Sequence, residues 1–179
     1  MKAKIFKGKI KIGELSKKDL KLAKEFLDFI NSLVEEDAQI TVNKKSNLKE
    51  EIKWLKQNLE GVRKKKKVFC IAKDKKKIVG IANIEMMGLR ESHVGILGIS
   101  VRKEYRGKGL GKYLMKEVLN LAKRKLKPKP KIIRLSVFST NQIAQNLYRK
   151  LGFKAVAKIP KQIQYKGKLI AEVIMIKEI

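Results

Sequence analysis

A glycine-rich turn separates an apolar run at residues 93–101 from a stretch with helical periodicity at residues 109–125. Its glycines fall at alternate positions, Gly107, Gly109 and Gly111. Glycine adopts positive φ without steric cost and lets a ligand approach the backbone closely. The amides at a helix start have no intrahelical partners and carry the positive end of the helix dipole. The turn therefore predicts a strand–turn–helix unit whose helix start binds an anion, such as a phosphate or pyrophosphate.

The remaining elements predict a sheet with helices on its faces. Apolar residues at alternating positions or in short runs indicate strands, and apolar residues at helical spacing indicate helices. We expect an α/β (α+β) fold with a mixed, mostly antiparallel central sheet. Ser16 and Asp19 predict a capping box, and Gly61 is expected to end the second helix. Strands are expected at residues 5–12, 68–72, 78–87, 93–101, 132–138, 154–159 and 169–177, and helices at 16–34, 47–59, 109–125 and 141–151.

Length, hydrophobic content and cysteine count exclude several classes of protein. The 179 residues suit a single domain, expected to span residues 1–179 with its core over about residues 10–177. A hydrophobic content of 44% excludes a disordered basic tail, and no run approaches the roughly 18 apolar residues of a membrane span. The single cysteine, Cys70, excludes a disulfide framework and a cysteine-based metal site. We expect a soluble, cytoplasmic protein without a metal.

The net charge of +28 has two interpretations. It can describe a solvated lysine surface, or it can attract a polyanionic partner such as nucleic acid, the ribosome or a phosphate-bearing cofactor. Nucleic-acid binders normally interleave aromatic residues or arginine with their basic residues. The runs at residues 64–67 and 75–77 contain only lysine, which favours the solvated surface and leaves weak RNA association open.

Two common phosphate-binding motifs do not fit the turn. A dinucleotide-binding fingerprint needs Gly-x-Gly-x-x-Gly, and a P-loop needs Gly-Lys followed by Ser or Thr, whereas Tyr113 follows Gly111-Lys112. The segment Arg106-x-x-Gly109-x-Gly111 instead resembles the Arg/Gln-x-x-Gly-x-Gly/Ala signature of the GCN5-related N-acetyltransferases, the GNAT family.

This resemblance implies the acyl-CoA N-acyltransferase fold, with acetyl-CoA as the acetyl donor. In that family the amides of the turn hold the pyrophosphate of coenzyme A, and the preceding strand splays from its neighbour and pairs with the pantetheine arm. Five cations, Arg102, Lys103, Arg106, Lys108 and Lys112, are expected to gather around the turn. The residues expected to bind the cofactor are Leu97, Gly98, Ile99, Ser100, Val101, Arg106, Gly107, Lys108, Gly109, Leu110, Gly111, Lys112, Asn141, Ala144 and Tyr148.

A second segment, residues 141–153, is similar to the later family motif Asn-x-x-Ala-x-x-Leu/Phe-Tyr-x-x-x-Gly-Phe. Asn141 is expected to cap the helix start, and Gly152 to end the helix in the left-handed conformation. Asn141 is also expected, by resemblance, to contact the cofactor arm or a bound water. One apolar stripe is expected on this helix, formed by Ile143, Ala144, Leu147, Tyr148 and Leu151.

Tyr148 has two possible roles, as a core aromatic and as a catalytic acid. An amine that attacks a thioester forms a tetrahedral oxyanion and expels a thiolate. A thiol has a pKa of about 8.5 and a phenol of about 10, so a positioned tyrosine can protonate the leaving sulfur. The resemblance implies this general-acid role, with the backbone N–H of Ile99 expected to stabilise the oxyanion.

The general base is left open, because the stretch at residues 94–98 lacks the carboxylate that many family members carry there. Glu85 and His93 are the catalytic candidates for the general base, and an imidazole has a suitable pKa of about 6.5. A weakly basic amine can also lose its proton to water, so a dedicated base is not required. Further carboxylates considered are Glu91, Glu35 and Glu36.

The sequence thus predicts an acetyl-CoA-dependent N-acetyltransferase that acts on a primary amine by direct attack in a ternary complex. The acceptor would be an amino acid, a peptide N-terminus or another small amine, selected by variable loops at residues 35–46 and 160–168. The absence of cysteine near either motif argues against an acyl-enzyme. The alternative is an acetyltransferase-fold binding module whose basic surface associates with RNA or the ribosome. A homodimer is left open.

Overall fold

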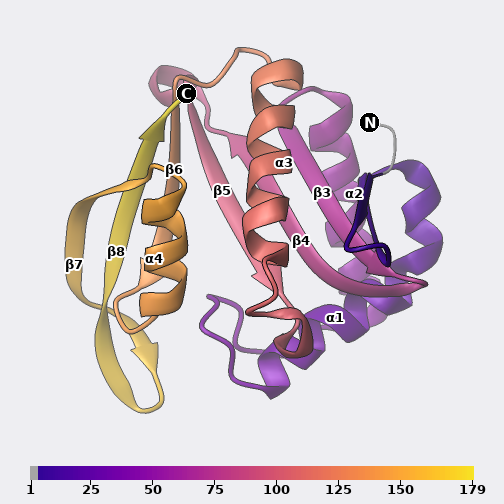
Figure 1. The fold of residues 1–179 in the computed structure, drawn as a ribbon, viewed down its shortest axis with the longest axis horizontal. Helices are drawn as coiled ribbons and strands as arrows, with labels where there is room; N and C mark the ends of the chain where they lie inside the picture. The colour runs from indigo at the N-terminus through magenta and orange to yellow at the C-terminus, as the bar shows by residue number, and fades with distance from the viewer. Residues whose placement is uncertain (1–3) are drawn as a thin grey trace.

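The computed structural model describes residues 4–179, which form one eight-stranded sheet and four α-helices (Figure 1). Within these residues the strand order is β1-β2-β3-β4-β5-β6-β8-β7, and only the β5–β6 pairing is parallel. The expected mixed, mostly antiparallel sheet is therefore confirmed. The strands are β1 Lys4–Phe6, β2 Ile10–Glu14, β3 Lys67–Asp74, β4 Lys77–Met86, β5 Val94–Val101, β6 Ile132–Phe138, β7 Lys154–Tyr165 and β8 Lys168–Glu178. The helices are α1 Ala23–Glu35, α2 Leu48–Arg63, α3 Leu110–Lys125 and α4 Gln142–Lys150.

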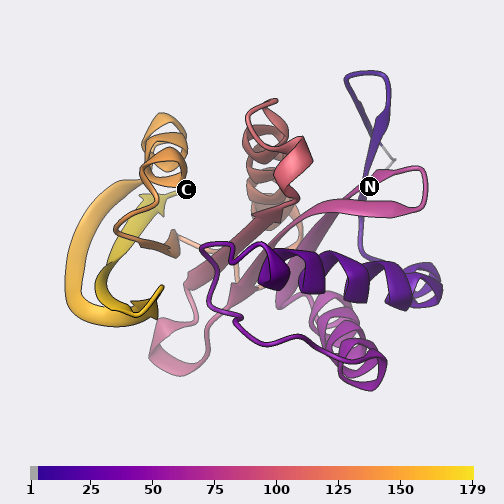
Figure 2. The ribbon, with the colours of Figure 1, turned by 90° about the horizontal axis from the view of Figure 1, so that it is seen from below.

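The helices lie in two layers, with α1 and α2 on one face of the sheet and α3 and α4 on the other (Figure 2). Alternation along β3 divides its side chains between the layers. Phe69 and Ile71 belong to the core under α1 and α2, and Cys70 belongs to the core under α3. Cys70 is a small buried side chain in this core, and burial raises the pKa of its thiol to about 12.

The N-terminal part differs from the expected elements in two places. The single strand expected at residues 5–12 is a hairpin of β1 and β2, turned by Lys7 and Gly8 at φ values of 50° and 68°. Gly61 does not end α2, which continues to Arg63. A Cβ at Gly61 would lie 3.0 Å from the Cβ of Lys67, so this glycine allows close packing rather than a helix stop. The Ser16–Asp19 capping box is confirmed, and it opens a 3₁₀ turn before α1.

The C-terminal part corrects two further predictions. Residues 160–168 are not a loop, because β7 and β8 form a long hairpin that turns at Lys166 and Gly167. Pro160 is tolerated because β7 is an edge strand, and the pairing slips between Ile159 and Ile163. Ile143 is 87% exposed and does not belong to the buried side of α4.

The sequence predicted that Arg102 would gather with the other cations around the turn, and the structure contradicts this prediction. The Arg102 side chain is 4% exposed and donates to the backbone oxygen of Ile78 (2.8 Å), to Ser32 Oγ (2.8 Å) and to Asp28 Oδ2 (2.5 Å). The guanidinium also lies over the ring of Phe29. Arg102 therefore ties α1 to the start of β4, and this role keeps it away from a ligand.

Glu51 gives a prediction about stability. It is 5% exposed on α2, and no cation among residues 4–179 pairs with it, so burial raises its pKa to about 7. The folded state therefore holds this proton more tightly than the unfolded chain. The resulting stabilisation is complete below the unfolded pKa and is lost as the pH rises through about 7. We expect Glu51→Gln to raise the free energy of unfolding at pH 8 by about 2 kcal/mol and to have little effect at pH 4.

Thermal unfolding followed by circular dichroism between pH 4 and 8 checks this expectation. The matched control is Glu50→Gln, since Glu50 is exposed and a Gln can still accept from the Asn47 backbone at the helix start. Equal pH dependence of the melting temperature in wild type and Glu51→Gln would refute the assignment.

Candidate functional site

Strands β5 and β6 separate part-way along their length. They pair in parallel only where Val94–Ile96 lie beside Ile132–Arg134. Beyond these residues β5 pairs with β4 alone and β6 pairs with β8 alone, and the two strands diverge in the ribbon (Figure 1). The splay expected for this strand is therefore observed.

Beyond Ile96, every second residue of β5 directs its backbone N–H and C=O groups toward the gap that opens between β5 and β6, which we call the divergence. Arg102 N donates to Val79 O (3.0 Å) directly beside the Gly80–Val101 pair. Because hydrogen-bonded and non-hydrogen-bonded pairs alternate in an antiparallel ladder, Ile99 and Val101 direct their N–H and C=O groups away from β4. Consistently, Val101 O accepts from Arg106 Nε (2.7 Å). The N–H of Ile99 thus points to the side that β6 has left.

The turn before α3 has the conformation that its glycines predict. Gly107 and Gly109 have φ values of +72° and +87°, and Gly109 is the N-cap of α3. Tyr113 N donates to Gly109 O, so the amides of the three residues between them precede the first intrahelical bond. A Cβ at Gly107 would meet nothing within 4 Å, and one at Gly109 would meet only Phe6 Cζ at 3.8 Å. The turn thus combines amides that lack intrahelical partners with open space beside Gly107 and Gly109, which fits a pyrophosphate.

Two of the cations around this turn are engaged by protein groups, and two others have no carboxylate partner among residues 4–179. The guanidinium of Arg106 is held by Val101 O and the carboxylate of Glu36, and Lys108 Nζ donates to Glu104 O (2.7 Å). Lys103 and Lys112 are exposed, and no carboxylate among residues 4–179 pairs with either. These two lysines are therefore available to an anionic ligand.

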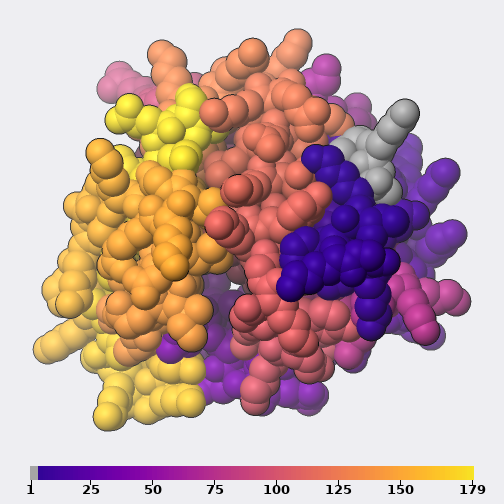
Figure 3. Space-filling model, viewed as in Figure 1, coloured from indigo at the N-terminus to yellow at the C-terminus, as the bar shows by residue number. Residues whose placement is uncertain are grey.

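Gly111 brings the turn, β5 and α4 into contact. A Cβ at Gly111 would lie 3.6 Å from Leu147 Cδ2 and 3.9 Å from Ile99 Cδ1, so the absence of a side chain sets the spacing between these elements. The space-filling view shows a furrow between the surfaces of α3 and α4 that narrows to a small opening near its middle (Figure 3). The furrow lies on the helix face that covers the diverging strands.

Tyr148 lies on α4 with its ring against Phe153, at a centroid distance of 6.2 Å. The residue is 8% exposed, and burial raises the pKa of its hydroxyl to about 12. No described side chain or backbone group hydrogen-bonds to this hydroxyl. The only fully buried side-chain polar atom without a partner in residues 4–179 is Asn58 Oδ1, so the Tyr148 hydroxyl still reaches solvent. It is a protonated, unengaged donor at neutral pH.

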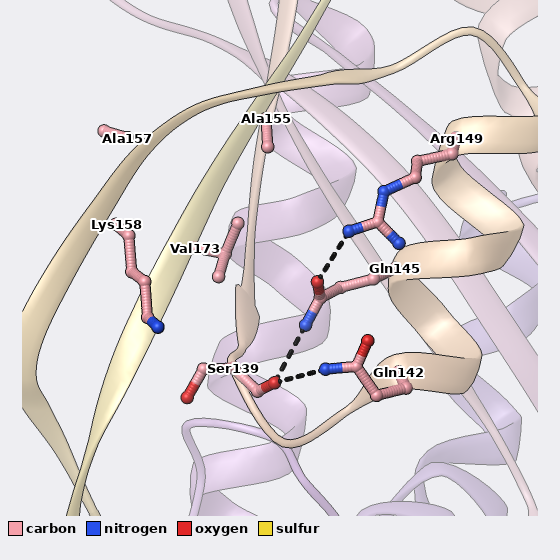
Figure 4. Close-up of a pocket in the computed structure, with 8 residues that line it drawn as sticks. All are labelled: Ser139, Gln142, Gln145, Arg149, Ala155, Ala157, Lys158 and Val173. Atoms are coloured by element: carbon pink, nitrogen blue, oxygen red, sulfur yellow. Dashed lines mark hydrogen bonds between the residues drawn. The ribbon is translucent and has the colours of Figure 1, made fainter.

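Two side chains hold α4 in place. Asn141 Oδ1 accepts from Ala144 N (3.1 Å), which confirms the expected cap. Gln145 is 4% exposed, and its amide donates to Phe138 O (3.3 Å) at the end of β6. The same amide donates to Ser139 O (3.0 Å), as Figure 4 shows. Sequence analysis missed Gln145, although a polar residue on the buried side of a short helix indicates such an anchor. The anchor borders a cavity of about 350 Å³ among α4, β7 and β8.

The structure does not bring the predicted bases together with Tyr148. Glu85 is exposed beside Ile96 and pairs with Lys67 Nζ (2.6 Å). His93 precedes β5 and lies six residues before Ile99, or about 20 Å at 3.3 Å per residue. Their role as general base stays a prediction without support from this geometry. The other carboxylates are engaged as well: Glu35 pairs with Lys45, Glu36 with Arg106 and Glu91 with Arg134.

Sequence analysis missed a polar residue near the point where β5 and β6 separate. This residue lies on the face of the sheet that α1 and α2 cover. Asn83 interrupts the apolar β4 strand, and its register partner on β5 is Gly98. A Cβ at Gly98 would lie 3.4 Å from Asn83 Nδ2. The only available signal was one amide within the run at residues 81–84.

The segment after α1 connects both sides of the divergence. Glu36 holds Arg106, Gln39 Nε2 donates to Thr140 Oγ1 (2.9 Å), and Tyr165 Oη donates to Asp37 O (2.9 Å). The three partners belong to the turn before α3, the β6–α4 connection and the β7–β8 hairpin. Residues 36–39 therefore cross the open end between β5 and β6.

The family comparison decides the classification. The family model described as the acetyltransferase (GNAT) family matches residues 28–153, which include β5, the glycine turn and α4. The chain belongs to the GNAT acetyltransferase family. Comparison with curated proteins gives no match.

Solved structures show the same fold as this acetyltransferase. A GNAT-family acetyltransferase from Streptococcus pneumoniae is 26% identical, with a TM-score of 0.82 over 95% of this chain and 99% of that one. Ribosomal-protein-alanine N-acetyltransferase from Brucella melitensis is 20% identical, with a TM-score of 0.79 over 94% of this chain and 99% of the other. The microcin C7 self-immunity acetyltransferase MccE, solved with acetyl-CoA and AMP, is 17% identical, with a TM-score of 0.75 over 96% and 93%.

Among residues 4–179, no three or more His, Cys, Asp or Glu side chains lie together as a group that could hold a metal ion. None of the helices in this range combines the length and the apolar character needed to cross a membrane.

Proposed function

We propose that this GNAT acetyltransferase moves the acetyl group of acetyl-CoA to a primary amine by direct attack in a ternary complex. The observation that carries the proposal is the meeting of three elements: the diverging β5 backbone at Ile99, the glycine turn at Gly111, and α4 with Tyr148. Acetyl-CoA would supply an activated thioester, and the chain would supply hydrogen-bond donors and a binding surface that positions the reactants.

Each part of the site has a role in this proposal. The amides after Gly109 would bind the pyrophosphate, with Lys103 and Lys112 adding positive charge. The open edge of β5 at residues 97–101 would hold the pantetheine arm by backbone hydrogen bonds. The N–H of Ile99 would donate to the oxyanion, where a fixed donor is most effective.

Tyr148 would protonate the departing sulfur. Its pKa of about 12 keeps the hydroxyl protonated throughout the physiological range, as a general acid requires. Cys70 is fully buried with a raised pKa, which disfavours a covalent acyl-cysteine route.

The acceptor is proposed to be zwitterionic or acidic rather than polycationic. A net charge of +28 repels a polyamine at long range and attracts groups that carry a carboxylate. The acceptor would approach from the face of α1 and α2, where Asn83 lies beside Gly98 and residues 36–39 cross the divergence.

A panel of amines tests the proposal. We expect acetyl-CoA-dependent release of free thiol with amino acids or peptide N-termini, and an acetylated product detected by mass spectrometry. Spermidine is expected to react at least about tenfold more slowly in kcat/KM at low salt, since steering by charge changes rates by one to three orders of magnitude. The buried Cys70 should contribute no background to the thiol readout. Micromolar cofactor binding without turnover on any amine would contradict the proposed activity. Absence of cofactor binding would favour a binding module instead.

A further inference from the structure

Exposed cations gather at the end of the molecule where α3 stops. They come from the α2–β3 connection and from the last turn of α3 with the connection that follows it. The two segments lie side by side, because Lys127 N donates to Lys65 O (3.0 Å). Seven exposed cations of these two segments have no carboxylate partner among residues 4–179. We call them the distal basic cluster: Lys65, Lys66, Lys123, Arg124, Lys127, Lys129 and Lys131.

This cluster is separate from the proposed cofactor site. Helix α3 starts at the glycine turn and ends at the cluster, and its 16 residues span about 24 Å at 1.5 Å per residue. The ribbon shows the two sites at opposite ends of α3 (Figure 1). A phosphate group held at the turn therefore neutralises none of the distal charges, since 24 Å exceeds the Debye length of about 8 Å at physiological salt.

Neighbouring acids do not balance the cluster. Glu60 is engaged by Arg63 and Lys64, Glu14 by Lys125, and Glu85 by Lys67. Glu178 is exposed and lies opposite Ile132 on β6, but it is one negative charge against the seven cations of the cluster. Favourable interaction with the helix dipole is confined to the last turn of α3, so among the cluster residues it applies to Lys123 and Arg124. The charges at residues 65, 66 and 127–131 lie outside the helix.

The character of the surface favours a nucleic acid over a membrane. The large exposed apolar side chains all lie outside residues 64–66 and 123–131, so these segments offer no group to insert between lipids. They also contain no aromatic residue, which excludes base stacking as a source of affinity. Lysine ammonium groups contact phosphates as point charges, and such contacts carry no sequence information.

We propose that the distal basic cluster binds the phosphate backbone of RNA without sequence preference, independently of the cofactor site. Binding is electrostatic and arises from the release of counterions. Its affinity therefore falls steeply with salt, with a slope of about −0.7 in log K against log[salt] for each phosphate neutralised on a single strand.

Fluorescence anisotropy with a labelled 20-nucleotide single-stranded RNA of mixed sequence tests this. The variant Lys123→Gln/Lys127→Gln/Lys129→Gln is expected to bind at least tenfold more weakly at 0.1 M salt and to lower the salt slope by about 2. The matched control is Lys18→Gln/Lys76→Gln/Lys168→Gln, which removes the same charge from exposed lysines outside the cluster. It should bind as wild type.

Four outcomes would overturn the proposal: no binding at 0.05 M salt, equal loss in both triple variants, displacement of the RNA by saturating coenzyme A, or tighter binding to anionic phosphatidylserine vesicles than to RNA. Equal loss would indicate net charge, and displacement would locate the RNA at the glycine turn. Amine acetylation by the cluster variant, measured in parallel, should remain at the wild-type level. This readout keeps a failure of the RNA proposal distinct from a failure of the proposed activity.

Discussion

Replacing Tyr148 by Phe is expected to lower kcat for amine acetylation by about 100-fold, or about 2.7 kcal/mol in activation free energy. The substitution removes only the hydroxyl, which donates to no described group and reaches solvent, while the ring keeps its packing on Phe153. The departing thiolate then lacks an acid. Since cofactor affinity is expected to come from the amides after Gly109 and the open edge of β5 rather than from this hydroxyl, the KM for acetyl-CoA should stay within about threefold of wild type.

The matched control is Tyr113→Phe, which removes a phenol from α3 whose ring packs on Phe6. It should leave kcat unchanged. The pH profile adds a second readout: because the pKa of Tyr148 is about 12, the wild-type rate should not fall between pH 8 and 10. Unchanged kcat in Tyr148→Phe with every active amine would rule out the general-acid role.

Gly109→Glu is expected to weaken acetyl-CoA binding by at least about 100-fold in calorimetry. Any residue with a Cβ is strained at the φ of +87° found here, at a cost of about 1–2 kcal/mol. A carboxylate among the free amides of the helix start would also occupy them and repel the pyrophosphate, and like charges about 4 Å apart near a protein surface repel by about 4 kcal/mol. The electrostatic effect is the larger of the two.

Gly167→Glu separates the two effects. Gly167 has a φ of +71° in the β7–β8 turn, and a Cβ there meets nothing within 4 Å, so it introduces similar strain and the same charge outside the site. Both variants should lose similar thermal stability, whereas only Gly109→Glu should lose cofactor affinity. If the two bind acetyl-CoA equally well, the pyrophosphate is not held at this turn.

Local sequence patterns predicted most of the secondary structure, and tertiary contacts account for the differences. The periodicity at residues 109–125 and 141–151 defined α3 and α4, since each helix buries one stripe. Gly61 stayed helical because Lys67 packs directly against it. The length of β7 was not predictable from its exposed residues, because its strand conformation depends on pairing with β8.

The candidate site was predictable where it depends on backbone conformation. The positive φ of Gly107 and Gly109 and the cap at Asn141 follow from the residue types. The partners of long charged side chains do not, because they come from distant elements. Arg102 is buried by Asp28 and Ser32 of α1, and Arg106 is engaged by Glu36, contacts that no spacing in the sequence indicates.

The short parallel pairing of β5 with β6 links ligand binding to folding. Within residues 4–179, three register pairs join β5 to β6, and a pantetheine arm along the open edge of β5 would act as an additional strand between the two parts of the sheet. A ligand that binds only the native state stabilises it by RT ln(1 + [L]/Kd), about 2.7 kcal/mol at a hundredfold excess over Kd. The resistance of this chain to unfolding then depends on the concentration of its own acetyl donor, and a cell depleted of acetyl-CoA holds a less stable enzyme.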